Sequence, residues 1–276
     1  MLDNMIESDG FNGVVRGKHG YFIYNKNDVY VGKAIEKYGE YSEAEVELLK
    51  QMCVENDIVI EIGANIGAHT IPLSQMVGDN GRIYAFEAQR IIFQTLCANL
   101  AINSLTNVEC FHMAVSSEDG FVMIPDIRYD LELNYGCVRA NQFSNGLRVP
   151  TISLDNFFSL PRLRLIKIDV EGMEFEVISG AKRIIEKFRP VLYVENGVKD
   201  KSKALIMLII SLGYRLYWHL PPFFNPSNFS SDSVNIYGGN IYKGEYSTNM
   251  LCIHKNYDLK IDGFIEVSDP DFYPFG

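Results

Sequence analysis

The sequence predicts a doubly wound α/β domain. Short apolar runs typical of buried strands alternate with helical patterns in at least five rounds, without internal repeats or low-complexity tracts. The clearest strand-like runs are residues 57–62 and 163–168, which have the apolar character of strands buried on both faces of a sheet. Ligands of open α/β sheets bind beyond the carboxyl ends of the strands. We therefore expect a binding site where these two strands end.

Composition limits the classes of function. With 276 residues, 47% of them hydrophobic, the chain can form one domain with a sizeable core. A formal net charge of −10 argues against nucleic-acid binding. We expect no signal peptide, because the first residues lack a basic and an apolar region, and no membrane span, because the longest apolar run, residues 204–210, is too short. The odd number of cysteines, without a C-x-x-C pair, favours reduced core thiols and a cytoplasmic location; they are Cys53, Cys97, Cys110, Cys137 and Cys252.

The first 41 residues are predicted to form an N-terminal β-hairpin extension. The β-prone residues 21–24 and 29–31 flank a polar turn, which indicates a hairpin. The main domain is then expected to cover residues 42–276 and to begin with a helix that has a capping box. Tyr41, just before this helix, is expected either to lean over a bound ligand or to be a solvated loop residue.

A glycine loop after the first strand is interpreted as a ligand loop. Gly63 and Gly67 let the backbone turn and approach a ligand, and a helix predicted over residues 70–77 offers unpaired N–H groups to an anionic group. The spacing lacks the third glycine of a dinucleotide site, and Glu61 would repel phosphates but suits an ammonium group. S-adenosylmethionine (SAM) has an ammonium group and no phosphate. This loop, with Asn65 inside it, is therefore the candidate site for its methionine end; an ordinary strand-to-helix turn is the alternative.

Two later turns extend the predicted cofactor site. Glu87 ends the next strand-like run, 24 residues after Gly63, where a ribose-binding acid is expected in a strand-helix-strand unit. Ala114 belongs to the turn 112–115 at the same sheet edge, where small and apolar residues suit an adenine ring. A surface glutamate and ordinary core residues are the alternatives. His69 precedes a helix and is interpreted as a capping or structural residue rather than as a base.

Acidic residues also follow the strand at 163–168. Asp169 and Glu171 stand at its carboxyl end, and Glu195 ends the next strand-like run. Because these strand ends share one sheet edge, we expect the three acids to lie near the ligand. Capping of the following helix is the alternative role for the first two, since a first helical turn favours negative charge. That helix is predicted as a single one over residues 177–188 from its 3.6-residue period.

Two irregular segments are predicted to lie on the acceptor side of the domain. One insertion covers about residues 120–150 and mixes polar and aromatic residues, as functional loops in compact domains commonly do. The other covers residues 219–249 and begins with His219 in an aromatic, proline-stiffened loop. Its aromatic rings suit stacking on a sugar, although core packing explains several of them equally well.

Together these motifs resemble the FkbM family of SAM-dependent methyltransferases. They are residues 61–67 (EIGANIG), 85–88 (AFEA), 154–155 (LD) and 166–174 (IKIDVEGME). The resemblance runs from about residue 38 to 196, and three tail segments resemble a bacterial branch associated with glycan gene clusters: 217–219, 224–226 and 249–251. Glu61 stands where the family usually has Asp, and Ala88 where it usually has Pro. The longer side chain of Glu61 leaves its ligand contact open.

The resemblance implies both a fold and an activity. The fold would be a Rossmann-like class I methyltransferase sheet, mostly parallel with an antiparallel last strand. The cofactor would be SAM, with S-adenosylhomocysteine as its product. The acceptor would be a small molecule or glycan, methylated on a hydroxyl oxygen of a sugar or a glycan-related compound.

An alcohol is a weak acid, so removal of its proton helps methyl transfer. Asp169 is the candidate general base or acceptor-orienting residue, and Glu171, Glu195 and His219 are lesser candidates for the same work. The three acids are also suitable ligands for Mg²⁺, but we do not expect a required metal, and no spacing suggests zinc. An NAD-type oxidoreductase and a non-catalytic SAM-binding α/β module are the alternative functions.

Overall fold

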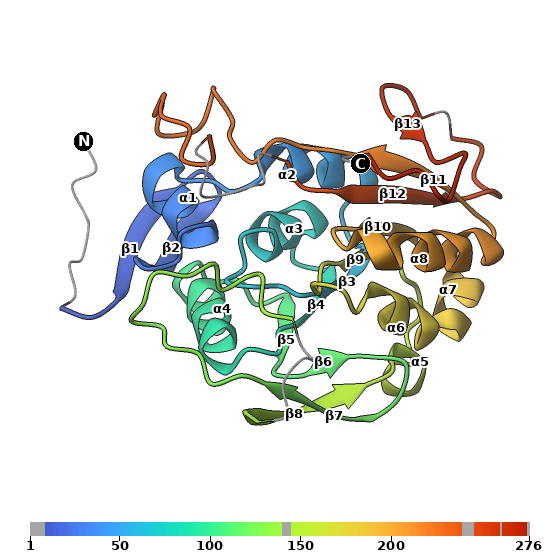
Figure 1. Ribbon diagram of the computed structural model, residues 1–276, viewed down its shortest axis with the longest axis horizontal. Helices are drawn as coiled ribbons and strands as arrows, with labels where there is room; N and C mark the ends of the chain where they lie inside the picture. The colour runs from blue at the N-terminus through green and yellow to red at the C-terminus, as the bar shows by residue number, and fades with distance from the viewer. Residues whose placement is uncertain (1–8, 140–144, 239–245, 260, 275–276) are drawn as a thin grey trace.

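The computed structural model describes residues 9–139, 145–238, 246–259 and 261–274, and its centre is an eight-stranded sheet (Figure 1). The strand order is β13-β11-β12-β10-β9-β3-β4-β5. Strands β5, β4, β3, β9 and β10 are mutually parallel, and β12 runs antiparallel between β10 and β11. In chain order the strands are β3 (Ile58–Ile62), β4 (Arg82–Phe86), β5 (Val108–Phe111), β9 (Leu165–Ile168), β10 (Val191–Glu195), β11 (Tyr214–His219), β12 (Asn249–His254) and β13 (Ile265–Glu266).

This topology confirms the predicted doubly wound sheet, mostly parallel with an antiparallel strand from the end of the chain. The predicted last strand is β12, and the two-residue β13 extends the sheet edge beyond it, antiparallel to β11. Helices cover both faces of the sheet. They are α1 (Val31–Tyr38), α2 (Glu43–Met52), α3 (Thr70–Val77), α4 (Arg90–Ile102), α5 (Leu154–Phe157), α6 (Glu174–Ser179), α7 (Lys182–Phe188) and α8 (Lys199–Ser211). Among the described residues no helix combines the length and apolarity needed to cross a membrane.

The alternation of side chains along β3 explains why both faces are covered. Val59 packs with α2, α3 and α4 in one core cluster, whereas Ile60 packs with α6, α7 and α8 in the other. Strand β9 alternates in the same way, with Leu165 in the first cluster and Ile166 in the second. A strand buried on both faces needs apolar residues at successive positions, which is the pattern that the sequence shows.

A small sheet and a hairpin complete the fold. The small sheet has the order β6-β8-β7 and lies along the lower edge in Figure 1; its strands are β6 (Ala114–Val115), β7 (Gly120–Ile124) and β8 (Leu147–Ile152). The hairpin joins β1 (Asn12–Gly17) and β2 (Gly20–Asn25). It packs through β2 against α4 and α1.

The predicted pairing of this hairpin is wrong. Residues 21–24 do form a strand, but they pair with β1 and not with residues 29–31, of which Val31 starts helix α1. The carboxylate of Asp28 is buried and accepts a hydrogen bond from the backbone N–H of Tyr30 at 3.0 Å. This carboxylate also accepts backbone N–H groups of Val31 and Gly32 in the first turn of α1, and these contacts outweigh the β propensity of the Val-Tyr-Val run.

The single helix predicted over residues 177–188 is also wrong, because it is divided into α6 and α7. The backbone of Gly180 approaches a neighbouring loop so closely that a Cβ there would lie 2.1 Å from the carbonyl oxygen of Ser116. The carboxylate of Asp155 then accepts the backbone N–H groups of Arg183 and Ile184 at 2.9 and 2.8 Å. This side chain starts a new helix, whereas the 3.6-residue pattern continues unbroken across the division.

Gly63 fixes how closely the ends of β3 and β9 approach each other. Its φ is +82°, and a Cβ at this position would lie 1.8 Å from the carbonyl oxygen of Asp169. Only glycine meets both the positive φ and the close backbone contact without strain. The two strand ends that carry the candidate site are therefore held together at this residue.

We expect Gly63→Ala to destabilise the protein far more than Gly263→Ala. Gly263 has a similar φ of +85° but nothing within 4 Å of an added Cβ, so it isolates the conformational cost of roughly 1–2 kcal/mol. The backbone clash at Gly63 should bring the loss above about 3 kcal/mol. Urea unfolding followed by circular dichroism measures both variants; equal losses would contradict the close approach.

Candidate functional site

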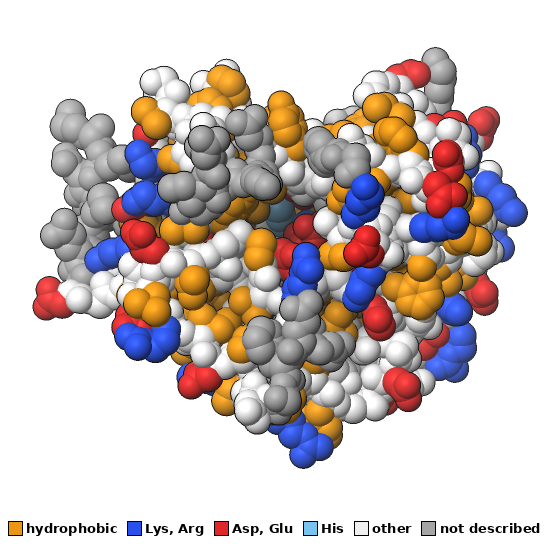
Figure 2. All heavy atoms as spheres, in the orientation of Figure 1, with side chains coloured by type: hydrophobic (Ala, Val, Ile, Leu, Met, Phe, Trp, Pro, Cys, Tyr) orange, Lys and Arg blue, Asp and Glu red, His pale blue; other side chains and the backbone are white. Residues whose placement is uncertain are grey.

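A cleft of about 900 Å³ lies at the carboxyl ends of β3, β9 and β10. Figure 2 shows it as a hollow near the middle of this face, with acidic side chains inside it. The glycine loop after β3 forms part of its lining, as does the segment 134–139 from the first predicted insertion. The expected site at the strand ends is therefore a real cavity.

The loop after β3 is held by hydrogen bonds from the neighbouring strand. The N–H groups of Gly63 and Ala64 both donate to the carbonyl of Phe86, and the N–H of Asn65 donates to the Glu87 carboxylate at 3.0 Å. Gly63 and Asn65 line the cleft, as does Glu87. Gly67 is not among the lining residues; with a φ of +90° it shapes the turn into α3.

Glu87 is a rigidly placed acid at the end of β4. Its second carboxylate oxygen accepts the N–H of Gln89 at 2.8 Å, and only 7% of the residue is exposed. Burial raises the pKa of Glu87 to about 7, although these backbone donors oppose the shift. An acid with fixed oxygens at this strand end suits a ligand hydroxyl pair, since a carboxylate accepts hydrogen bonds.

An apolar slot adjoins the cleft beside Glu87. It is lined by Phe86, Met113, Ala114, Ile124 and Met173, among others, and it shares Gly63 and Gln89 with the cleft. Ala114 thus lies in this slot and not in the cleft itself. A narrow apolar slot next to a hydroxyl-binding acid suits a flat ring attached to a sugar.

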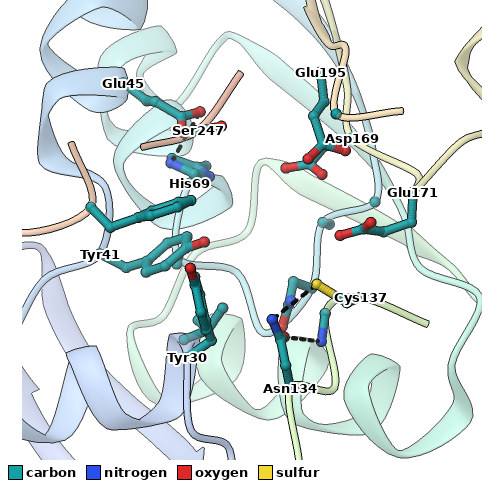
Figure 3. Close-up of a pocket in the computed structure, with 18 of the residues that line it drawn as sticks. Tyr30, Tyr41, Glu45, His69, Asn134, Cys137, Asp169, Glu171, Glu195 and Ser247 are labelled. Carbon is teal, nitrogen blue, oxygen red and sulfur yellow. Dashed lines mark hydrogen bonds and ion pairs between the residues drawn. The ribbon is translucent and has the colours of Figure 1, made fainter. Parts of the chain in front are cut away.

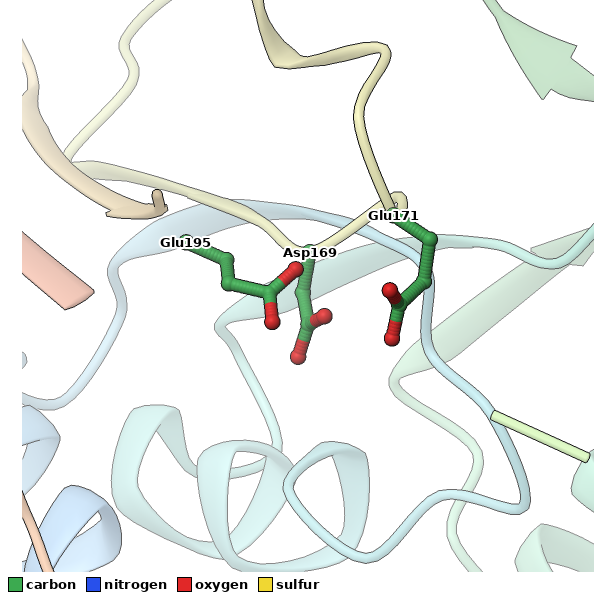
Figure 4. Close-up of side chains that lie close together, drawn as sticks. All are labelled: Asp169, Glu171 and Glu195. Atoms are coloured by element: carbon green, nitrogen blue, oxygen red, sulfur yellow. The ribbon is translucent and has the colours of Figure 1, made fainter. Parts of the chain in front are cut away.

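The carboxylates of Asp169, Glu171 and Glu195 meet in one cluster, with ligand atoms all within 4.8 Å of one another (Figure 4). Burial and then the charge of Asp169 raise the pKa of Glu171 to about 7, and the same two causes raise the pKa of Glu195 well above its usual value. Like charges this close do not all ionise at neutral pH, so the cluster holds a proton. Carboxylate oxygens also match Mg²⁺, and the absence of a required metal stays a prediction.

Lys167 is the site residue that sequence reasoning missed most clearly. It is 1% exposed, and its Nζ lies 3.2 Å from a carboxylate oxygen of Asp169. Burial would lower the pKa of this ammonium group, but the carboxylates of Asp169, Glu61 and Glu45 outweigh burial and raise it. The signal in the sequence was a lysine inside the apolar run that forms β9. An unpaired charge is too costly to bury there, so such a lysine indicates carboxylate partners nearby.

Glu61 lies beneath the loop and not in the cleft lining. It is fully buried and stands directly opposite Lys167 in the β3–β9 register. One carboxylate oxygen accepts the hydroxyl of Thr70 at 2.7 Å, and the other has no hydrogen-bond partner among the described residues. Burial raises the pKa of Glu61 to about 7. Glu61 therefore supports the loop from below and does not contact the cleft directly.

A second group of polar residues faces the acidic cluster across the cleft (Figure 3). Tyr41 and His69 line this wall together with Glu45 of α2. The Nε2 of His69 lies 3.8 Å from a Glu45 oxygen and has no hydrogen-bond partner in the described chain, and its side chain makes no capping hydrogen bond to α3. Burial and the nearby Lys167 charge lower the pKa of His69, so this imidazole is neutral at pH 7. The sequence predicts a capping or a structural role for His69; its side chain makes no capping hydrogen bond, so the structural alternative is the one left.

His219 is placed away from the other candidates. It is absent from the cleft lining, its Nδ1 shares a hydrogen bond of 2.8 Å with the Tyr193 hydroxyl, and its ring packs edge-on against Phe264. Burial lowers its pKa to about 4. The structure thus brings Tyr41, Glu87 and the three acids to one cleft, but not His219.

We expect Glu61→Gln to flatten the pH dependence of stability. Because burial raises the pKa of Glu61 from 4.5 to about 7 in the folded chain, the free energy of unfolding falls as pH rises through that interval and is constant above it. Removal of the titrating group should reduce this fall by up to ~3 kcal/mol. Urea titrations at pH 5 and pH 8 measure the free energy of unfolding of variant and parent. An equal change between the two pH values in both proteins would contradict the raised pKa of Glu61.

This chain is similar to several known proteins. Hexuronic acid methyltransferase AglP of Haloferax volcanii is 26% identical over 171 residues, which cover 58% of this chain and 66% of that protein. Methyltransferase sdnD of Sordaria araneosa is 24% identical over 194 residues, which cover 55% of this chain and 72% of that protein. The crystal structure of methyltransferase FkbM from Methylobacillus flagellatus KT is 17% identical with a TM-score of 0.48, and the match covers 72% of this chain and 43% of that one.

The chain therefore spans just under two thirds of the first relative and less than half of that crystal structure. A family model also matches this chain. It is described as the Methyltransferase FkbM domain and covers residues 61–216, from the end of β3 into β11. Since this match includes more than half of the chain, the protein belongs to the FkbM methyltransferase family.

Proposed function

We propose that this protein transfers the methyl group of SAM to a hydroxyl oxygen of a sugar or glycan-related acceptor. The observation that carries the proposal is the cleft at the strand ends, in which Glu87, fixed by two backbone N–H groups, stands beside an apolar slot and a cluster of acids. The FkbM family membership supports methyl transfer.

Each part of SAM has a matching part of the cleft. Glu87 accepts hydrogen bonds from the ribose hydroxyls, and the slot that contains Ala114 takes the adenine ring. The glycine loop, with Gly63 and Asn65, borders the amino-acid end, where Lys167 and Asp169 supply one cation and one anion. A nicotinamide dinucleotide would bring a pyrophosphate into a cleft in which carboxylates outnumber cations, which argues against an oxidoreductase.

The chain's own residues supply alignment and a proton acceptor. When SAM is bound, its sulfonium makes the methyl group electrophilic, so an attacking oxygen must lie in line with it. Fixed geometry of this kind contributes ~7–11 kcal/mol. Asp169 takes or orients the hydroxyl proton, while its ion pair with Lys167 fixes its position. Glu171 and Glu195 are lesser candidates for this role, and His219 is the weakest because it lies outside the cleft lining.

The two predicted insertions supply the acceptor side in this proposal. Cys137 and Arg139 come from the segment 120–150, and Phe223 comes from the segment 219–249; all line the cleft. The name of the Haloferax relative, a hexuronic acid methyltransferase, supports a sugar as the class of acceptor. We also propose a cytoplasmic location, which the five cysteines without a disulfide in the described chain favour.

Glu87→Gln should weaken SAM and S-adenosylhomocysteine binding roughly ten- to hundredfold, because hydrogen bonds to a charged acceptor are lost. Isothermal titration calorimetry measures both ligands. Glu109→Gln, near the start of β5 with a half-exposed side chain, is the matched control and should bind normally. Unchanged binding by the Glu87 variant, or tighter binding of NADH than of SAM by the parent protein, would refute the cofactor assignment.

Asp169→Asn should lower kcat about 10²- to 10⁴-fold, the usual range for a lost general base. Transfer of labelled methyl from SAM to a panel of monosaccharide glycosides measures turnover. Asp79→Asn, in the exposed loop before β4, is the control that should keep full activity. If the Asp169 variant turns over normally, the base is another residue; if the parent protein binds SAM but methylates nothing, the chain is a binding module.

A further inference from the structure

The cleft has an unequal balance of charge. Two cations line it against a larger set of carboxylates, which are Glu45, Glu87, Asp169, Glu171 and Glu195. Of the cations, Lys167 is buried and already bound to Asp169, and Arg139 is an exposed residue near the cluster. Above about pH 7, where Glu87 and Glu171 are ionised, an acceptor that enters this cleft therefore meets mainly negative charge.

The opposite wall carries aromatic rings and His69 beside the carboxylate of Glu45. Tyr41 stacks on Phe223 with ring centroids 5.8 Å apart and planes 22° apart, and Tyr30 meets the same phenylalanine edge-on at 5.2 Å. His69 stands beside them, with only 6% of its surface exposed and its Nε2 without a hydrogen-bond partner in the described chain. Aromatic faces suit the C–H face of a sugar ring, and an unpartnered buried imidazole nitrogen next to the cleft suits a hydroxyl.

The chemistry of the acidic cluster also favours a hydroxyl. When a hydroxyl oxygen attacks, its O–H bond breaks, the new O–CH₃ bond forms, the C–S bond breaks, and S-adenosylhomocysteine leaves. The proton needs an acceptor, and Asp169 stands in the cleft with two further carboxylates beside it. A carboxylate nucleophile is already ionised at neutral pH and brings no proton to remove. One base is therefore needed for the first nucleophile, whereas the ionised carboxylates of the cluster only repel the second.

We infer that the acceptor is a sugar that carries no carboxylate, either neutral or amino-substituted, and that the Asp169, Glu171 and Glu195 cluster rejects uronic acids. This inference rests on the proposed function and narrows its acceptor. The inferred acceptor differs from the one in the name of the Haloferax relative, which is a hexuronic acid.

Three matched probes test the inference at pH 8.5, where Glu171 with its pKa of about 7 is ionised. They are the p-nitrophenyl β-glycosides of glucose, glucosamine and glucuronic acid. Methyl transfer from labelled SAM gives kcat/KM for each probe. We expect the glucuronide to fall at least ~tenfold below the glucoside, because a like charge enters beside partly buried carboxylates, and the glucosaminide to equal or exceed the glucoside.

A charge-removing variant distinguishes repulsion from poor fit. Glu171→Gln should reduce the ratio of kcat/KM for the glucoside to kcat/KM for the glucuronide several-fold, because it removes a repelling charge. The ratio compares two acceptors in one variant, so it stays informative even if both rates fall. Glu186→Gln, on the exposed face of α7, should leave the ratio unchanged. A parent protein that methylates the glucuronide as well as the glucoside, or a Glu171 variant with an unchanged ratio, would overturn the inference. Failure of the parent to bind SAM would instead overturn the proposed function, and the inference with it.

Discussion

The site depends on the pairing of the buried Lys167 ammonium group with the carboxylates around it. The lysine sits in the middle of the sheet, 1% exposed, with Asp169 at 3.2 Å and Glu61 opposite it on the neighbouring strand. A cation in this place without its carboxylates would carry the full cost of a buried, unpaired charge. The pairing therefore ties the end of β9 to the end of β3 and fixes the carboxylate that points into the cleft.

Around this ion pair the loop and the neighbouring strand hold each other in place. Gly63 lets the backbone of β3 touch that of Asp169, and Glu87 at the end of β4 is bonded to the N–H of Asn65. Three adjacent strands thus end in one rigid surface built largely from backbone contacts. Rigid placement of this kind is what methyl transfer needs, because the barrier is lowered chiefly by alignment of the reacting atoms.

Burial and close spacing raise the pKa values of several acids in the cleft. Burial and mutual repulsion raise the pKa of Glu171 to about 7, and Glu87 reaches the same value mainly through burial. Such groups change their protonation near neutral pH, as residues at functional sites often do. The opposite wall carries neutral rings and the neutral imidazole of His69. The two walls thus have different chemistry, one suited to protons and cations and the other to the faces and hydroxyls of a ring.

The sequence by itself determined the alternation of strands and helices in the main sheet, the glycine loop and the acids at the strand ends, because hydrophobic periodicity and turn residues act locally. It misplaced the hairpin partner and the division between α6 and α7, since Asp28 and Asp155 cap helices through contacts that no periodicity records. Only the tertiary structure decided that Glu61 lies under the loop, that His69 and Glu45 face the cleft, and that His219 does not. The physical reason is that burial and charge pairing depend on neighbours distant in the chain, as Lys167 between Glu61 and Asp169 illustrates.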